Sequence, residues 1–395
     1  MKRIVVLFLL LGTITNSHAQ RKKKTSPIKE PVINQSFNRI FCGTLDSFYT
    51  RLHRLEKIKN GTVTVVQIGD SHTQPDFISS VVREKLQQRF GNAGRGLVFP
   101  YQLAQSNAPL DIISSSYQNW SFNRVAHPEI NSFSGISGFE IESSASAGRL
   151  DFELKDRLGV QQNFSRIQLF YEKDSEVVAT LVVGSDTLQS ESSNSIKLPQ
   201  PTNKFSWSFS GNQDTVRFFG AVLASGKPGV FYHNIGVNGA KYEHYNLAPV
   251  FWQQLSSLKA DLYIVSLGTN EAQSPVFDPV YIEQQLSLFI QNIRAITPEA
   301  DILITTSADS YKKGVYNAEQ REVNNCIARY CEKNRIPIWD LYRVTNGFGA
   351  SKRWMQKGYM NKDGVHYLRA GYEIHGQLLR DCLMQGYEKY IKSNF

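Results

Sequence analysis

One stretch constrains the fold of this 395-residue chain more than any other: the β-branched run at 63–68, which stops at Gly69-Asp70-Ser71. Such a run, ended by a glycine, predicts a buried parallel strand that leads into a tight turn. Apolar residues then recur at helical spacing from Phe77 to Phe90, and Gly91 is suited to end that helix. Ser71 is therefore expected at the carboxyl end of a strand, where open α/β sheets bind their ligands.

The strand-then-helix pattern returns after Gly229 and continues to the end of the chain. Parallel neighbours need helical crossovers, so five such strands predict a doubly wound parallel sheet. Besides 63–68, strands are expected at 231–237, 261–267, 301–306 and 336–339, and helices at 45–55, 245–255, 281–296, 323–330 and from about residue 370.

Residues 108–229 have a different texture. Short β-rich segments alternate there with Ser, Gly, Asn and Asp clusters about every ten residues, with no helical period. This pattern predicts an all-β sandwich or jelly roll, inserted between the first and second strands of the sheet. The α/β domain is accordingly expected in two parts, 38–107 and 230–395, and the glycine-rich stretch 91–100 is predicted to be a turn.

The first residues resemble a targeting segment. Residues 1–19 combine a basic start, an apolar run and small residues before Gln20, which predicts a secretory signal peptide cut after Ala19 and a secreted or periplasmic protein. Its removal would lower the net charge from +9 to about +7. Residues 20–37 are predicted to be a disordered basic leader. Neither nucleic-acid binding nor membrane insertion is expected, because no aromatics alternate with the bases and no later stretch is apolar enough.

The cysteines and histidines give no sign of a metal. The chain has four cysteines, Cys42, Cys326, Cys331 and Cys382, and neither they nor the histidines have ligand spacing, so neither a metal nor a cofactor is expected. One long-range disulfide and buried free thiols are both compatible with the sequence.

Side chains able to perform ester chemistry lie near predicted strand ends and in the last loop. Serine needs a base to become nucleophilic, and His366 is such a base. Asp363, three residues earlier, is placed to orient the imidazole. The backbone N–H groups of Ser71 and Gly239 and the amide of Asn270 are candidate donors to an oxyanion. Each motif alone is an ordinary turn. The four motifs together, in this order, indicate a catalytic site.

These four segments resemble the four blocks of the SGNH/GDSL hydrolase superfamily: Gly69-Asp70-Ser71, Gly239, Gly268-Thr269-Asn270 and Asp363-x-x-His366. The resemblance implies a flavodoxin-like three-layer α/β/α domain with a five-stranded parallel sheet. It also implies Ser71 as nucleophile, Asp363 and His366 as its partners, and Gly239 and Asn270 as the oxyanion hole. Gly-Asp-Ser-His-Thr, Gly-Thr-Asn-Glu-Ala and the β insertion look most like the peptidoglycan O-acetylesterase branch, whose insertion resembles a carbohydrate-binding module.

The function that this resemblance implies is a serine esterase that removes O-acetyl groups from a cell-wall or other extracellular glycan, without a cofactor. An acetylated polysaccharide is then the expected partner. Two alternatives remain at this stage. An acyltransferase would use the same three residues with a sugar hydroxyl as acceptor, and a non-enzymatic glycan-binding protein would use the insertion.

Overall fold

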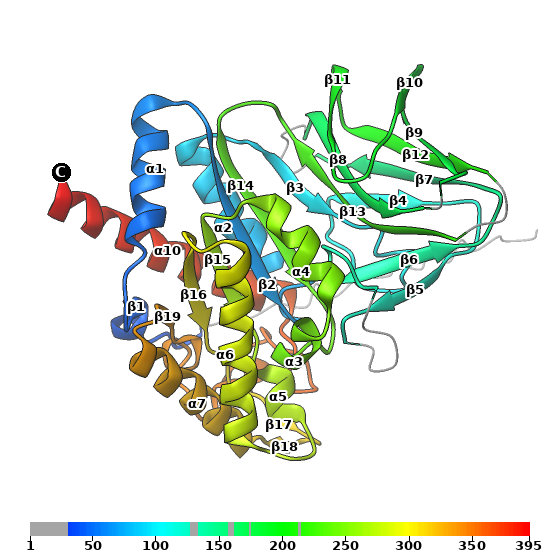
Figure 1. Cartoon of the computed structure of the whole chain (residues 1–395). Coiled ribbons are helices and arrows are strands. Elements are labelled where there is room, and N and C mark those ends of the chain that lie inside the picture. The colour runs from blue at the N-terminus through cyan, green and yellow to red at the C-terminus, as the bar shows by residue number, and fades with distance from the viewer. Residues whose placement is uncertain (1–30, 127–132, 157–161, 174, 212–214) are drawn as a thin grey trace, which may run out of the picture.

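The computed structural model describes residues 31–126, 133–156, 162–173, 175–211 and 215–395. The predicted signal peptide and most of the predicted leader lie outside these residues. Figure 1 shows an α/β part beside a β-rich part, which matches the predicted fold class.

The α/β part is built on a six-stranded sheet. Five strands are parallel, as predicted, and a two-residue edge strand, β1, pairs antiparallel with β19. In spatial order the parallel strands are the second, first, third, fourth and fifth along the chain, which is the flavodoxin-like order. The sheet order is β1 (Ile40–Phe41), β19 (Ile338–Trp339), β16 (Asp301–Thr305), β15 (Leu262–Ser266), β2 (Thr62–Gly69) and β14 (Gly229–Gly236).

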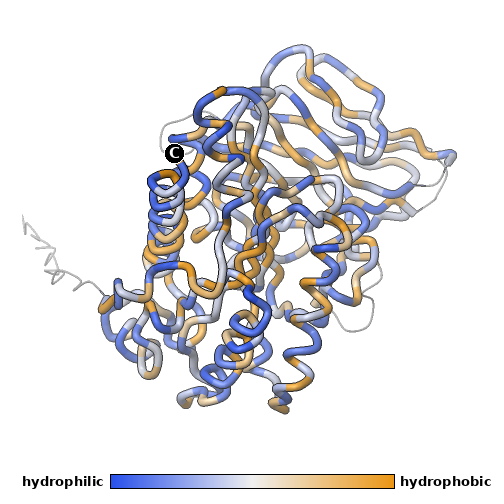
Figure 2. The backbone as a smooth tube through the Cα atoms, turned by 60° about the vertical axis from the view of Figure 1, so that its left-hand side comes forward, coloured by the Kyte–Doolittle hydropathy of each residue, from blue (hydrophilic) through white to orange (hydrophobic). Residues whose placement is uncertain are grey.

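Helices cover both faces of this sheet because its strands are apolar on both sides. One face packs against α1 (Asp46–Ile58), α2 (Phe77–Phe90) and α10 (Arg369–Asn394). The other packs against α4 (Pro249–Leu255), α6 (Pro279–Ile296) and α7 (Ala318–Asn334). In Figure 2, hydrophobic colour runs along the central strands and along one side of the surrounding helices.

The β-rich part consists of two packed antiparallel sheets. The first contains β10 (Asp186–Gln189), β9 (Val178–Val183), β12 (Lys204–Ser210), β7 (Ala147–Leu154) and β4 (Ile112–Ser115). The second contains β11 (Ser195–Thr202), β8 (Phe164–Glu172), β13 (Val216–Ala224), β6 (Phe139–Ser143) and β5 (Ser121–Arg124). Trp207, Phe152 and Phe218 lie in the core, and Trp120 is partly buried against it. The β-sandwich predicted for this region is thus present.

The insertion is continuous with the α/β part. The glycine-rich stretch predicted to be a turn instead contains β3 (Gly94–Val98), which pairs antiparallel with β13 of the sandwich. The close pairing requires glycine at position 94, because an added Cβ would lie 2.4 Å from the carbonyl oxygen of Leu223. One hydrophobic cluster extends from the sandwich to the α4, α6 and α7 face of the sheet. The two parts therefore share a core.

Two other segments differ from the sequence-based expectation. The segment expected as one helix over 245–255 forms α3 (Tyr242–Asn246) and α4, since Pro249 begins a new helix at its first turn. Residues 34–37, placed by prediction in the disordered leader, contact the fold: the Asn34 N–H donates to the Val344 carbonyl, 2.8 Å away, and residues 35–37 form a 3₁₀ turn.

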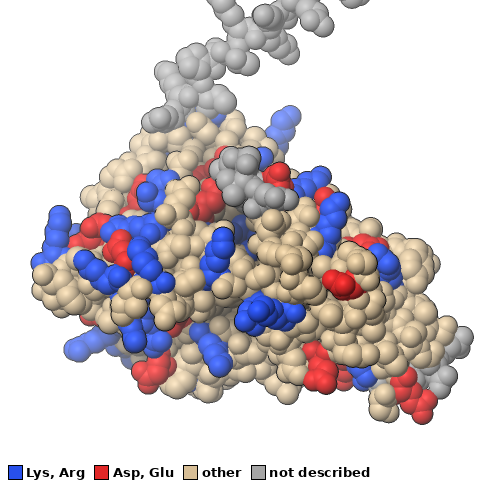
Figure 3. Space-filling model, turned by 90° about the horizontal axis from the view of Figure 1, so that it is seen from above, with Lys and Arg blue, Asp and Glu red and all other residues tan. Residues whose placement is uncertain are grey.

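Among the described residues, the helices are too short or too polar to cross a membrane. On the face seen from above, basic and acidic side chains are interspersed (Figure 3). All four cysteines are free thiols in this structure; Cys42 is exposed and the other three are buried.

Candidate active site

The carboxyl ends of β2, β14 and β15 lie at one edge of the sheet, toward the lower side of Figure 1. A cleft of about 750 Å³ lies at this edge. Ser71 follows β2, Gly239 follows β14, and Asn270 lies in α5 (Thr269–Gln273), directly after β15. His366 comes from the loop before α10. The structure thus brings the sequence-predicted residues to one place: Ser71, Gly239, Asn270 and His366 line the cleft.

Asp363, the fifth predicted residue, contacts His366. The Oγ of Ser71 lies 2.9 Å from Nε2 of His366, and Nδ1 of the same ring lies 2.9 Å from Oδ2 of Asp363. The other oxygen of Asp363 accepts the backbone N–H groups of Val365 and His366. With Nδ1 protonated and bonded to Asp363, Nε2 is free to accept the proton of Ser71.

The carboxyl of Asp363 is held in its charged form. Burial would raise its pKa, but hydrogen bonds from the Val365 N–H and from the ring and backbone of His366 outweigh it, so the pKa lies below its ordinary value. The side chains of Asp363 and His366 are 47% and 42% exposed. Water therefore reaches this pair directly.

A glycine sets the shape of the loop that carries the pair. Gly364 has φ of +68°, and a Cβ there would lie 2.6 Å from Cγ of Tyr311. The Gly364 carbonyl accepts the Tyr311 N–H, 2.8 Å away. A side chain at this position would push the loop away from Tyr311 of the β17 strand (Tyr311–Lys312) and displace its catalytic candidates.

The turn that carries Ser71 is fixed by backbone hydrogen bonds. The Asp70 carboxylate accepts the N–H of His72, and the Asp70 carbonyl accepts the N–H groups of Thr73 and Gln74. Asp70 is buried, and this burial raises its pKa to about 6. The Ser71 hydroxyl bonds to His366, whereas the Asp70 carboxylate bonds to the backbone, so Asp70 shapes the turn and does not activate the nucleophile directly.

Three donors point to an oxyanion site. The Nδ2 of Asn270 donates one hydrogen to the Ala240 carbonyl at 2.9 Å, which leaves its second N–H for a ligand. Within the part of the chain that the structure describes, the backbone N–H groups of Ser71 and Gly239 have no hydrogen-bond partner. Gly239 has φ of +83°, a conformation that favours glycine.

Sequence reasoning did not single out Gln74, which ties three segments together. Its Oε1 accepts the Asn238 N–H at 2.8 Å, and its Nε2 donates to Oγ of Ser106 and to the Asn107 carbonyl. These bonds hold the Gly239 turn and the entry to the insertion against the nucleophile turn. No sequence pattern marks Gln74, because its partners lie 32 to 164 positions away.

Glu271 belongs to the Gly-Thr-Asn-Glu-Ala motif, but the sequence analysis assigned it no role of its own. It is buried next to Asn270, and its Oε1 accepts the N–H of Tyr242 at 2.9 Å. This bond joins the segment after β14 to α5, the two segments that carry Gly239 and Asn270. Burial raises the pKa of Glu271 to about 7.

His72 and two tyrosines form the wall behind His366. The His72 ring stacks on that of His366, with centroids 5.4 Å apart, and its Nδ1 lies 3.1 Å from the Tyr372 hydroxyl. Burial, followed by the nearby His366, lowers the pKa of His72 to about 3, so this ring is neutral. Tyr367 and Tyr372 line the cleft as well.

Two further histidines, His233 and His244, do not line the cleft. His233 is buried and accepts the Leu97 N–H, and His244 accepts the Lys241 N–H. In the described part of the chain, no group of three or more His, Cys, Asp or Glu side chains could hold a metal ion.

A serine, a histidine and an aspartate joined in this way at the strand ends of a flavodoxin-like sheet define the class of a serine hydrolase. Residues 201–374 match the model of the GDSL-like lipase/acylhydrolase family, which confirms the predicted resemblance to the SGNH/GDSL hydrolases. The matched range includes Gly239, Asn270, Asp363 and His366; Ser71 lies before it. The coarse class of the protein is therefore an acylhydrolase.

One solved structure that covers most of the chain agrees with the fold. A peptidoglycan O-acetylesterase structure has a TM-score of 0.75 at 22% identity and covers 89% of this chain and 99% of its own. Two other structures match smaller shares of the chain. The acetyl xylan esterase AlAXEase has a TM-score of 0.33 at 16% identity and covers 39% of this chain and 81% of its own. A lipase/acylhydrolase from Enterococcus faecalis has a TM-score of 0.30 at 18% identity and covers 39% of this chain and 75% of its own. A search of curated proteins gave no match. The first of these structures spans both the α/β part and the insertion.

Proposed function

We propose that this protein is a serine esterase that removes O-acetyl groups from an extracellular glycan, with O-acetylated peptidoglycan as its substrate. The observation that carries the proposal is the chain of contacts from Ser71 through His366 to Asp363, with both distances at 2.9 Å. The agreement in fold with a peptidoglycan O-acetylesterase across both parts of the chain supports the choice of polymer.

In the first half of the reaction, Oγ of Ser71 attacks the acetyl carbonyl carbon while its proton passes to Nε2 of His366. The carbonyl oxygen becomes an oxyanion, which accepts hydrogen bonds from the Asn270 amide and the N–H groups of Ser71 and Gly239. When the intermediate collapses, the bond to the sugar oxygen breaks, and that oxygen takes the proton from His366. The acetyl group remains on Ser71.

In the second half, water replaces the sugar. His366 takes a proton from the water as the oxygen attacks the acetyl carbon, and returns it to Ser71 as acetate leaves. Asp363, which is ionised, stabilises the imidazolium that forms in each half. The exposure of His366 and Asp363 supports water as the acceptor in preference to a second sugar.

The proposal places the protein outside the cytoplasm, where its signal-like residues 1–19 would direct it. A glycan lying in the cleft would also pass the start of the insertion, since Asn107 and Ala108 line the same cleft as Ser71.

The experiment is to measure acetate released from O-acetylated peptidoglycan and from acetylated xylan, with wild type and with Ser71→Ala, at neutral pH. We expect wild-type release from peptidoglycan and none from Ser71→Ala. Release from xylan alone would overturn the choice of polymer. Undiminished release by Ser71→Ala would overturn the esterase mechanism.

A further inference from the structure

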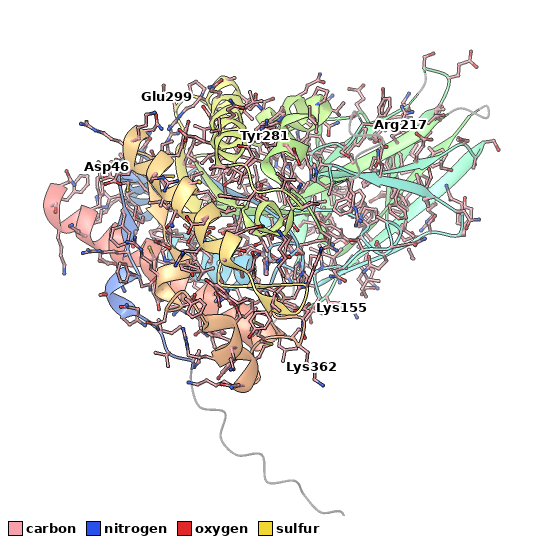
Figure 4. All side chains as sticks on the ribbon, turned by 90° about the horizontal axis from the view of Figure 1, so that it is seen from below. Asp46, Lys155, Arg217, Tyr281, Glu299 and Lys362 are labelled. Carbon is pink, nitrogen blue, oxygen red and sulfur yellow. The ribbon has the colours of Figure 1, made fainter. Side chains whose placement is uncertain are left out.

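A second groove, of about 230 Å³, continues the active-site cleft toward the insertion. Pro75 and Phe77 line both spaces, so a ligand that extends from Ser71 in this direction enters the groove. One wall comes from the insertion, with Leu110 and Lys155; the other comes from the start of α10, with Arg369. Figure 4 shows Lys155 on the face viewed from below, where the insertion meets the α/β part.

The base of the groove is rigid and electrically balanced. Two carboxylates lie there, Asp76 and Asp111, and both are buried. Asp76 is bonded to Arg83 at 2.7 Å and to Arg95 at 2.8 Å, and Arg95 also donates to Asp111 at 2.6 Å. These bonds join α2, β3 and the insertion, so the walls are held in place before a ligand arrives.

Both cations on the walls keep donors for a ligand, although Arg369 is also paired with Glu373, which lines the same groove. Lys155 is exposed and, among the described residues, has no ion pair. Arg369 lies over the Phe77 ring at 5.7 Å and donates from Nε to Glu373 at 2.7 Å. Its two terminal nitrogens have no hydrogen bond to any described residue. A guanidinium with both terminal nitrogens free is suited to bind a carboxylate in a bidentate manner.

The remaining surface fits a peptide better than a bare sugar. Leu110, which is 60% exposed, and Phe77 supply apolar contact, and the exposed carboxylate of Asp156 lies beside Lys155. A ligand that complements this groove carries carboxylates, an ammonium and short aliphatic groups. The stem peptides that substitute muramic acid have this composition, whereas a neutral acetylated xylan has none of it.

We propose that this groove binds the stem peptide of peptidoglycan, and that Arg369 and Lys155 pair with the carboxylates of that peptide. The inference rests on the proposed deacetylation of peptidoglycan. It adds that the enzyme selects its polymer by the peptide and not by the sugar alone.

The test compares wild type with an Arg369→Ala/Lys155→Ala variant on O-acetylated peptidoglycan strands, before and after an amidase has removed the stem peptides. The control, Lys197→Ala/Lys389→Ala, removes the same charge from exposed positions in the insertion and on α10, away from the groove. We expect wild type and control to have kcat/KM about tenfold higher with the peptides present, and the groove variant to lose this preference. Hydrolysis of 4-nitrophenyl acetate should be equal in all three proteins.

Binding of free stem tetrapeptide to Ser71→Ala, followed by NMR or calorimetry, tests the groove without turnover. We expect binding that Arg369→Ala/Lys155→Ala abolishes in the same background. If acetate is released equally with and without stem peptides and the tetrapeptide does not bind, the groove proposal is wrong although the esterase stands. If the tetrapeptide binds in the groove but no acetate is released, the proposed function fails while the peptide site stands. Faster release from a uronic-acid glycan than from peptide-bearing strands would also overturn the proposal.

Discussion

The hydroxyl of Ser71 lies within hydrogen-bond distance of the His366 ring, although 295 positions separate the two residues. The parallel sheet makes this possible, because the turn after β2 and the loop before α10 lie at the same edge. The insertion lengthens the chain between the two residues without moving this edge, since it leaves after α2 and returns at β14. The site is thus a property of the α/β part, and the insertion adds a neighbouring surface.

Replacing Asp363 with Asn should lower kcat for ester hydrolysis by about 10³–10⁴-fold. The Asn oxygen still accepts the Val365 and His366 N–H groups, but the amide offers no charge to stabilise the imidazolium. The free energy of unfolding should change little, because Asp363 is half exposed. Steady-state kinetics with 4-nitrophenyl acetate, alongside urea unfolding, checks this; a loss of less than tenfold would remove Asp363 from the mechanism.

Asn270→Ala should reduce kcat by about 10²–10³-fold, the usual cost of removing one oxyanion donor. KM should change less, since the oxygen becomes charged only in the transition state. The same assay measures both constants. A rise in KM with kcat unchanged would mean that Asn270 binds the ground state and is not an oxyanion donor.

Gly364→Ala should destabilise the protein more than Gly358→Ala. Both glycines have positive φ, +68° and +76°, so both variants bear backbone strain of about 1–2 kcal/mol. Only at Gly364 does the new Cβ clash with Tyr311, which should cost about 1–3 kcal/mol more and displace the loop of His366. Urea unfolding and esterase rate are the measurements. Equal behaviour of the two variants would show that the contact with Tyr311 does not hold the loop.

Glu271→Gln should make the stability of the protein less dependent on pH between about 4.5 and 7. The buried Glu271 keeps its proton up to a pKa of about 7 in the folded state, whereas the unfolded chain loses it near 4.5. Folding therefore becomes less favourable as pH rises through this window, by on the order of 3 kcal/mol from this one group. Gln does not titrate, so the variant should gain stability relative to wild type from pH 5 to pH 8. The urea midpoints of wild type and Glu271→Gln at pH 5 and pH 8 test this. A difference between the two midpoints that is the same at both pH values would contradict the prediction.

Much of the fold follows from local sequence patterns. Residues 63–68 and 301–306 are rich in β-branched and aliphatic residues, and they form β2 and β16 because strands buried on both faces need such residues. The boundary between the α/β part and the sandwich is visible in the sequence, because apolar residues at helical spacing give way there to short β-rich segments. The four segments that converge on the cleft were predictable from residue type and order.

The remainder depends on contacts between distant residues. The stretch at 94–98 reads as a glycine-rich turn, yet it forms β3 because β13, which follows the intervening sandwich, pairs with it. Gln74 has no local signature. Glu271 lies in the Gly-Thr-Asn-Glu-Ala motif, but the motif does not reveal its role, since that role arises from a partner on another segment, as does that of Gln74. Likewise, no pattern near Arg369 indicates that Lys155 and Leu110 share its groove.

The central claim, that Ser71 is an activated nucleophile, is tested most directly by its reaction with a fluorophosphonate. Wild type, Ser71→Ala and His366→Ala would be treated with the reagent, digested, and mapped by mass spectrometry. The account predicts one phosphonylated residue, Ser71, in wild type, no labelling of Ser71→Ala, and much slower labelling of His366→Ala. Labelling of another residue, or undiminished labelling without His366, would contradict it.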